Sequence, residues 1–231
     1  MVATSPIEIS IVIPTLDEAP SLAQTLIAAR ERGGGELIVA DGDSRDATRD
    51  VATRLADTVI AAPRGRAAQM NAGAAVARGD VLLFLHADTQ LPDGFADAVA
   101  RALEDPGVVG GYFAVALDAA GWRYRLTERL ISGRSRLTGV ATGDQAIFVR
   151  RSVFEALGGF ASLPLMEDID LVRRLKRRGR VAALRERVVT SARRWERHGL
   201  WRTVLLMWTL RLAYYAGVSP DTLARRYRDA R

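Results

Sequence analysis

The sequence of 231 residues predicts an α/β fold with a doubly wound, mainly parallel sheet flanked by helices. Two strand–turn–helix units follow one another near the N-terminus, and a third apolar run of strand length, from Val81 to Leu85, ends in polar residues. Consecutive units of this kind pair as parallel strands, so the polar groups that follow each strand meet at one edge of the sheet. The order of elements therefore predicts both the fold and the edge at which a ligand binds.

The first two units share one pattern, in which a β-rich run leads through a polar loop into a helix with apolar residues at helical spacing. Pro14 follows the first strand, and a run of three glycines ends the first helix. The predicted ranges are strand 7–13, loop 15–18, helix up to 33–35, strand 36–40, turn 41–46 and helix 47–56.

The third strand carries the most informative polar pair. The run from Val81 to Leu85 reads as a buried strand, and His86 and Asp88 follow it directly. A carboxylate and an imidazole two residues apart can hold a divalent cation at a sheet edge. An ordinary polar turn at the end of a strand is the alternative interpretation.

Further polar groups precede or follow other predicted elements. Arg64 and Arg66 flank a glycine at the start of a small-residue helix, where guanidinium groups and free helix N–H groups can converge on a phosphate. The alternative is a solvated, Arg-rich loop. Glu167 and Asp168 precede a helix over 169–177, where acidic residues also favour the positive end of the helix dipole.

Composition limits the class of protein. A chain with 48% hydrophobic and 26% charged residues suits one globular domain, and zero cysteines exclude disulfides and thiol catalysis. The N-terminus has no pattern of a secretory signal, which predicts a cytoplasmic protein. The net charge of +6 favours anionic ligands or an anionic membrane surface. Nucleic-acid binding is not predicted, because no nucleic-acid motif accompanies the dense basic run over 174–180.

The C-terminal part reads as a helical extension, with a catalytic domain over 1–190 and the extension over 191–231. The stretch from Leu200 to Tyr215 is apolar, but it is too short and too charged to span a bilayer comfortably. It is predicted to pack on the domain, on a second subunit in a homodimer, or peripherally on the inner face of a membrane. One helical face of this stretch carries five large apolar residues: Trp201, Leu205, Trp208, Leu212 and Tyr215.

Four segments together resemble the family 2 glycosyltransferases. The likeness spans roughly residues 7 to 180, and it rests on the motifs at 11–18, 40–46, 84–88 and 166–171, in that order. The resemblance implies a GT-A fold with a mixed, mainly parallel sheet. It also implies a glycosyltransferase of the hexosyltransferase class, which inverts the anomeric centre and takes its sugar from a nucleotide-diphosphate donor.

The resemblance assigns roles residue by residue. It places Asp168 on the catalytic base, beside Glu167, and Asp88 on the metal-binding end of an Asp-x-Asp motif. His86 departs from the family pattern, which has Asp there; a mixed N/O ligand set favours Mn²⁺ over Mg²⁺. The nucleotide-binding positions implied are Pro14, Thr15, Asp17, Glu18, Asp41, Arg64, Arg66 and Asn71. The sugar and acceptor positions implied are Gly110, Gly111, Asp144 and Gln145, although the last two can equally close a turn.

Two alternatives stay open at this point. A nucleotidyltransferase that makes sugar nucleotides would share the α/β architecture, but its Gly-rich N-terminal signature is absent after Ile13. A non-catalytic nucleotide-sugar-binding protein would retain the fold. The acceptor is not identified by the sequence, and a lipid-linked acceptor is one class that fits the C-terminal helix.

Overall fold

The computed structural model describes residues 7–229, except for the side chains of residues 194, 197, 198, 228 and 229. These residues contain an eight-stranded sheet with the order β3-β2-β1-β4-β7-β6-β8-β5. The strands are β1 (Ile9–Thr15), β2 (Glu36–Asp41), β3 (Thr58–Ala61), β4 (Val81–Phe84), β5 (Thr89–Gln90), β6 (Val108–Asp118), β7 (Ile147–Arg150) and β8 (Arg180–Ser191).

The strand directions create one functional edge. β1 pairs in parallel with β2 and β4, and β7 runs antiparallel to β4. Because β7 is reversed, the residues that precede it lie at the same edge as the residues that follow β1, β2 and β4. The sheet is therefore mixed, as predicted, and this edge gathers polar groups from both halves of the chain.

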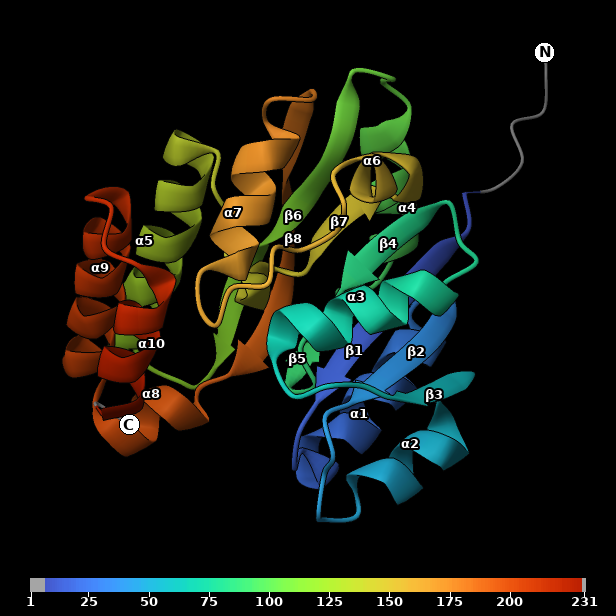
Figure 1. Cartoon of the computed structure of the whole chain (residues 1–231), viewed down its shortest axis with the longest axis horizontal. Helices are drawn as coiled ribbons and strands as arrows, with labels where there is room; N and C mark the ends of the chain where they lie inside the picture. The colour runs from blue at the N-terminus through green and yellow to red at the C-terminus, as the bar shows by residue number, and fades with distance from the viewer. Residues whose placement is uncertain (1–6, 230–231) are drawn as a thin grey trace.

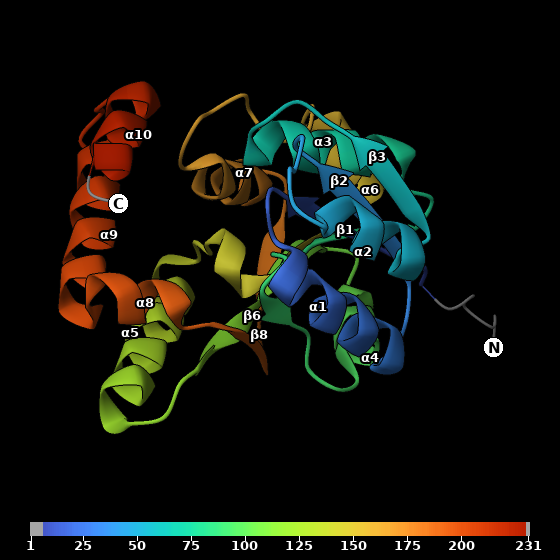
Figure 2. The same cartoon turned by 90° about the horizontal axis from the view of Figure 1, so that it is seen from below.

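Helices cover both faces of the sheet. Figure 2 shows α3, α6 and α7 on one side and α1, α2 and α4 on the other. The α-helices are α1 (Ala19–Glu31), α2 (Thr48–Leu55), α3 (Arg66–Val76), α4 (Phe95–Leu103), α5 (Trp122–Thr138), α6 (Arg151–Ala156), α7 (Glu167–Leu175), α8 (Arg193–His198), α9 (Leu200–Tyr215) and α10 (Pro220–Asp229), and a 3₁₀ turn, η1, spans Gly143–Gln145.

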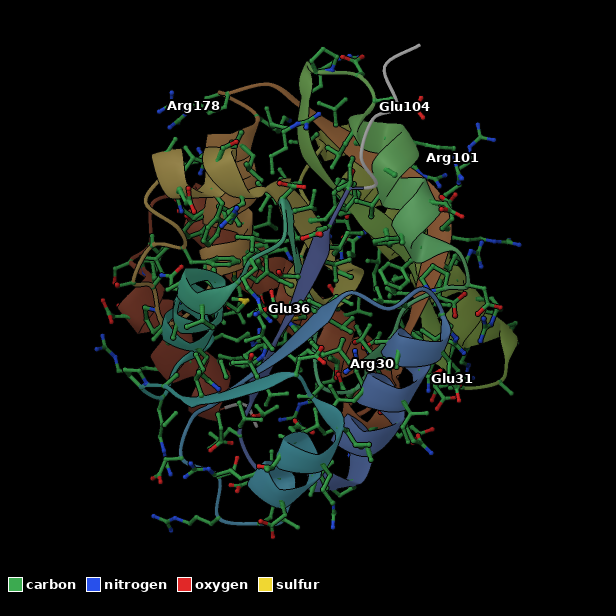
Figure 3. The ribbon with its side chains drawn as sticks, turned by 90° about the vertical axis from the view of Figure 1, so that its right-hand side faces the viewer. Arg30, Glu31, Glu36, Arg101, Glu104 and Arg178 are labelled. Carbon is green, nitrogen blue, oxygen red and sulfur yellow. The ribbon has the colours of Figure 1, made fainter. Side chains whose placement is uncertain are left out.

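The alternation of side chains along β1 explains the two layers. Ile11 and Ile13 point into a core that includes α1 and α4, whereas Val12 points into a second core with α3, α6 and α7. Strand residues alternate between faces with a period of two, so one apolar strand supplies both cores. The outer surface is charged. Figure 3 shows Arg101 of α4 and Glu104, which directly follows α4, at the surface of the molecule.

The C-terminal helices lie beyond the β6–β8 side of the sheet, where α9 and α10 stand beside α5 (Figures 1 and 2). α9 covers the predicted range, and its inner residues, such as Leu210, pack with Met166, Ile169 and Leu223. Its outer residues are exposed, from 46% for Trp208 to 66% for Leu205. Within residues 7–229, no helix is long and apolar enough to cross a bilayer.

Several boundaries differ from the sequence prediction. β1 continues through Pro14 to Thr15, because these two residues stay paired with Ala40 and Asp41 of the parallel strand β2. The residues just before β7 form η1, and the strand itself begins only at Ile147. The sequence patterns did not identify β3, α5, β8 or α10. The division at residue 190 stays a prediction, and the N-terminal residues 1–6 and the side chain of Arg194 lie outside the described residues.

Candidate functional site

The ends of β1 and β2 form a hydrogen-bonded group that we call the β1–β2 rim: Thr15, Asp17, Asp41, Ser44 and Gln69. Asp41 is buried, and its carboxylate accepts hydrogen bonds from Thr15 Oγ1 at 3.2 Å and from Ser44 N at 3.0 Å. Gln69 Nε2 donates to Thr15 O at 2.7 Å and to Ala40 O at 2.9 Å. The amide of Gln69 thus joins the two strand ends, and the orientation of Asp41 is fixed by protein groups.

The predicted loop after β1 is held against the turn after β2. Asp17 N donates to Ser44 Oγ at 2.9 Å, and Arg45 N donates to Asp17 Oδ1 at 2.7 Å. Glu18 N donates to Thr48 Oγ1 at 2.8 Å. Asp17 adopts a φ of 55°, a left-handed conformation that Asp tolerates better than most residues. These contacts bring Asp17, Glu18 and Asp41 together at one edge.

The segment with His86 and Asp88 follows a strand, as predicted, and forms a turn. β4 ends at Phe84, and Thr89 N donates to His86 O at 3.1 Å. The turn is tied down at Ala87 O, which accepts from Thr25 Oγ1 at 2.8 Å. Asp88 therefore stands on a fixed loop at the same edge as the β1–β2 rim.

Arg193, immediately after β8, bridges two of the predicted site residues. Its Nη2 lies 3.8 Å from Asp88 Oδ2 and 3.5 Å from Glu18 Oε2. The guanidinium balances charge between the loop after β1 and the turn after β4. The end of β8 is also held there, since Ser191 N donates to Asp88 O at 3.1 Å.

A second group, the α5–α7 rim, consists of Arg134, Asp144, Glu167 and Asp168. Asp168 lies in the first turn of α7, where Oδ2 accepts from Gly143 N and Oδ1 accepts from Ile169 N, both at 2.7 Å. Burial, together with the neighbouring Glu167 carboxylate, raises the pKa of Asp168 to about 7. The two backbone hydrogen bonds and Arg66 oppose this rise.

Gly143 allows η1 to approach Asp168. A Cβ at this position would lie 2.7 Å from His86 Nε2 and 3.7 Å from Asp168 Oδ2. A side chain there would clash with the imidazole, so the close contact between η1, α7 and the turn after β4 requires glycine. His86 and Asp168, which are far apart in sequence, consequently both lie close to Gly143.

The two predicted arginines have different surroundings. Arg64 Nε donates to Gly42 O at 3.2 Å, and its Nη2 lies 3.3 Å from Asp43 Oδ2, so this side chain lies over the end of β2. Arg66, the first residue of α3, pairs with Glu167 at 3.6 Å between Nη1 and Oε1. Arg66 thus belongs beside the α5–α7 rim, where it balances the carboxylates of α7.

Two of the predicted residues, Gln145 and Asn71, form hydrogen bonds within the protein. Gln145 is fully buried, accepts from Ser135 Oγ at 2.7 Å and donates to Phe113 O at 3.1 Å, a geometry that fits the turn-closing alternative. Asn71 donates to Phe160 O at 2.9 Å and accepts from Phe160 N at 2.8 Å, so it holds the loop after α6.

Gly110 and Gly111 lie within the sheet. A Cβ on Gly110 would lie 2.5 Å from Phe148 O, and one on Gly111 would lie 2.4 Å from the Phe148 ring. They pair with Val149 and Phe148 of β7, below the polar edge. The structure thus gives both glycines a packing role and does not bring them to the edge that carries Asp41, Asp88 and Asp168.

Sequence reasoning missed several members of the site. Gln69 and Arg193 contribute contacts that no local pattern predicts, because each reaches a partner in another segment. Ser44 and Arg134 were also not among the predicted site residues. A sequence signal existed for Ser44, which lies within the polar turn after β2, and for Gly143, which precedes Asp144. Arg134 lies on a helix that the periodicity did not identify.

Comparison with known proteins agrees with this geometry. The profile of Glycosyl transferase family 2 matches residues 10–158, so the chain belongs to that family. Residues on both sides of the sheet's functional edge, including Asp41, Asp88 and Asp144, fall within the matched range. The mixed sheet with helices on both faces is the GT-A fold.

Two curated relatives are similar over part of their length. The chain is 34% identical over 167 residues to the undecaprenyl-phosphate 4-deoxy-4-formamido-L-arabinose transferase of Pseudomonas aeruginosa (strain LESB58), a match that covers 64% of this chain and 49% of the relative. It is 33% identical over 167 residues to the PGL/p-HBAD biosynthesis glycosyltransferase of Mycobacterium bovis (strain BCG / Pasteur 1173P2). That match covers 65% of this chain and 62% of the relative. The match thus extends over about half to two thirds of the relatives' length.

Solved structures give the same fold. The S. aureus TarS fragment 1–349 superposes with a TM-score of 0.61 at 14% identity, covering 86% of this chain and 64% of TarS. The complex of that fragment with UDP superposes with a TM-score of 0.62 at 13% identity. That match covers 80% of this chain and 60% of TarS. At this level of identity the similarity establishes the fold.

Proposed function

We propose that this protein is an inverting glycosyltransferase that moves a sugar from a nucleotide-diphosphate donor to an acceptor hydroxyl. The observation that carries the proposal is the juxtaposition at one sheet edge of a buried, hydrogen-bonded Asp41, the turn with Asp88, and Asp168 with a pKa of about 7. A general base is most effective when its pKa lies near the working pH. Family membership and the UDP complex of the structurally similar TarS support the same donor class.

The reaction follows from the roles of the residues. An oxygen of Asp168 that keeps a free lone pair removes the proton of the acceptor hydroxyl, whose oxygen then bonds to the anomeric carbon. The bond from that carbon to the diphosphate oxygen breaks, and the electron pair leaves with the nucleotide diphosphate. The β1–β2 rim holds the nucleotide, and Arg193 faces the charge that grows on the leaving group.

A divalent cation fits the donor set at the turn after β4. Among the described residues there is no cluster of three or more His, Cys, Asp or Glu side chains able to hold a metal. Asp88, with His86, would therefore supply a minority of the ligands, with diphosphate oxygens and water supplying the others, as is usual for Mg²⁺ and Mn²⁺ at nucleotide sites. When bound, such a cation would stabilise the departing diphosphate as a Lewis acid, and the imidazole favours Mn²⁺.

We further propose that the exposed face of α9 holds the protein at the inner surface of a membrane, close to a lipid-linked acceptor. Trp201, Leu205, Trp208, Leu212 and Tyr215 are all at least 46% exposed, although the opposite face of the helix packs on the domain. Trp122 and Leu137 of the neighbouring α5 are also exposed. Apolar and aromatic residues beside arginines are typical of helices that lie in the interface of anionic bilayers.

The donor proposal is tested by thermal shift with nucleotide diphosphates and their sugars, with and without Mn²⁺. A ligand at about 100 times its Kd stabilises the folded protein by about 2.7 kcal/mol, or roughly 5–10 °C in Tm for a chain of this length. Asp88→Ala should abolish the Mn²⁺-dependent part of the shift. Asp93→Ala, a nearby carboxylate that is 92% exposed, is the matched control and should keep it.

The same screen separates the alternatives. Release of nucleotide diphosphate from a nucleotide sugar in the presence of an acceptor identifies a glycosyltransferase, whereas formation of nucleotide sugar from a nucleoside triphosphate and a sugar phosphate identifies a nucleotidyltransferase. Binding with neither reaction identifies a non-catalytic binding protein. A Mn²⁺-dependent shift that survives Asp88→Ala would remove Asp88 from the metal site.

The membrane proposal is tested by co-sedimentation with liposomes that contain or lack anionic lipid, beside light scattering to measure mass in solution. Trp201→Ala combined with Trp208→Ala should abolish a salt-sensitive binding to anionic liposomes. Ile27→Ala combined with Val76→Ala removes exposed apolar side chains elsewhere and should have no effect. A stable dimer that ignores liposomes would assign the α9 face to subunit packing.

A further inference from the structure

Among residues 7–229, the α5–α7 rim contains one buried donor atom and one buried acceptor atom that form no hydrogen bond. In the part of the chain that the structure describes, Arg134 Nε and Asp144 Oδ1 are buried and have no hydrogen-bond partner. A buried polar group without a partner loses free energy of hydration, and such atoms are uncommon in folded proteins. Two such atoms in one rim, one a donor and the other an acceptor, are complementary to a ligand group that can both donate and accept.

Arg134 is held in place at its other end. Its Nη2 donates to Ser135 Oγ at 2.9 Å, and Ser135 Oγ donates to Gln145 Oε1 at 2.7 Å. Gln145 closes η1, the turn that also contains Asp144 and whose Gly143 N donates to Asp168. A continuous chain of contacts therefore fixes Arg134 and Asp144 relative to Asp168.

The charge environment of Arg134 is set by burial and by carboxylates of the same rim. Burial lowers the pKa of Arg134, and the carboxylates of Asp144 and then Asp168 are the neighbours that oppose the shift most. Against the effect of burial, the carboxylates of Glu167, Asp168 and Asp144, in decreasing order of effect, raise the pKa of Arg66. Arg134 and the neighbouring Arg66 thus share Asp144 and Asp168 as charged neighbours, and Asp168 is the base of the proposed reaction.

We propose that Arg134 and Asp144 are a hydroxyl-binding pair, in which Arg134 Nε donates to a substrate hydroxyl and Asp144 Oδ1 accepts from it. This inference rests on the proposed glycosyl transfer and adds a specificity-determining residue, Arg134, which lies within the family-matched range of residues 10–158 but outside the four motifs at 11–18, 40–46, 84–88 and 166–171. A hydroxyl uses both atoms at once. A phosphate would instead place its negative charge beside Asp144, Glu167 and Asp168, so the rim favours a neutral polyhydroxy group.

That hydroxyl belongs either to the donor sugar or to the acceptor, and kinetics distinguish the two. Arg134→Gln and Asp144→Asn remove one member each, and Arg134→Lys keeps the charge as a conservative variant. Arg136→Gln, an exposed arginine two residues along α5, and Asp118→Asn, exposed at the end of β6, are the matched controls. The probes are the nucleotide sugar that gives the largest thermal shift, its nucleotide diphosphate, and methyl glycosides as hydroxyl acceptors.

If the donor sugar supplies the hydroxyl, both variants weaken binding of the nucleotide sugar about tenfold and leave binding of the nucleotide diphosphate unchanged. If the acceptor supplies it, donor binding is unchanged and the KM for the methyl glycoside rises about tenfold. In either case, the double variant should cost less than the product of the single effects, because the two residues share one group.

Arg134→Lys should recover part of the loss, which a purely structural role of the guanidinium would not predict. Variants that match the two controls in both binding and KM would overturn the proposal, as would a loss confined to Tm. These outcomes differ from failure of the proposed function, in which the wild-type protein itself neither binds nor turns over any nucleotide sugar.

Discussion

The β1–β2 rim and the α5–α7 rim use polar side chains in opposite ways. In the first, Asp41 and Gln69 form hydrogen bonds with neighbouring protein groups. In the second, Arg134 Nε and Asp144 Oδ1 have no hydrogen-bond partner among the described residues, and burial together with Glu167 raises the pKa of Asp168 to about 7. The groups of the first rim are hydrogen-bonded within the protein, whereas the second rim contains two buried atoms without a partner in the described part of the chain, to which we assign a role in recognition.

The contrast has a topological origin. The β1–β2 rim is assembled from consecutive strand–turn–helix units, so its partners lie within about one unit of each other along the sheet. The α5–α7 rim collects α5, η1 and α7, which are separated by β7 and α6. Contacts that depend on the whole fold can hold groups in environments that no local segment would stabilise.

The largest expected effect comes from a substitution in the α5–α7 rim that removes the proposed catalytic base. Asp168→Asn should lower turnover by on the order of 10²-fold or more while donor affinity changes little, because a base acts in the transition state. Steady-state kinetics and calorimetry of donor binding check this. Asp170→Asn, on the same helix but paired with Arg174, is the control and should keep most of the activity. Near-normal turnover of Asp168→Asn would refute the single-displacement mechanism.

The next effect comes from a substitution in the β1–β2 rim. Gln69→Ala removes two buried hydrogen bonds that join β1 to β2, which should lower the free energy of unfolding by about 2 kcal/mol and Tm by roughly 4–8 °C. Thermal unfolding measures it. Gln24→Ala, at an exposed position of α1, should leave Tm within about 1 °C. An unchanged Tm in Gln69→Ala would show that the rim does not depend on this amide.

The smallest effect sharpens the comparison through pH. The rate should rise with pH through about 7, because the base must lose its proton and burial together with Glu167 raises the pKa of Asp168 to about 7. Glu167→Gln removes a neighbouring negative charge, so the charged form of Asp168 becomes easier to reach and the midpoint should fall, by less than about one pH unit.

The pH dependence of kcat/KM tests this shift. Glu155→Gln, an exposed glutamate on α6, should leave the midpoint where the wild-type protein has it. A midpoint that rises in Glu167→Gln would mean that Glu167 acts on Asp168 through Arg66, its ion-pair partner, more than through direct repulsion.

The sequence by itself determined the α/β fold and the position of polar groups, including Asp41 and Asp88, at the carboxyl ends of β1, β2 and β4. These follow from local patterns, since apolar runs define strands and polar residues directly after them must reach the sheet edge. The range of α9 was predictable for the same reason, because an apolar run of 16 residues can be recognised in the sequence without knowing what the helix packs against. The candidate Asp168 came instead from the resemblance to the family 2 glycosyltransferases.

Tertiary structure alone decided which candidates face the site. Gln145, Asn71 and Gly110 carry the same residue types that bind substrates elsewhere, but here they close a turn, hold a loop and permit close strand packing. Arg134 and Arg193 reach the site from α5 and the end of β8, elements with weak local signals. Their positions, and the raised pKa of Asp168, depend on burial and on charges from distant segments, which a sequence pattern does not encode.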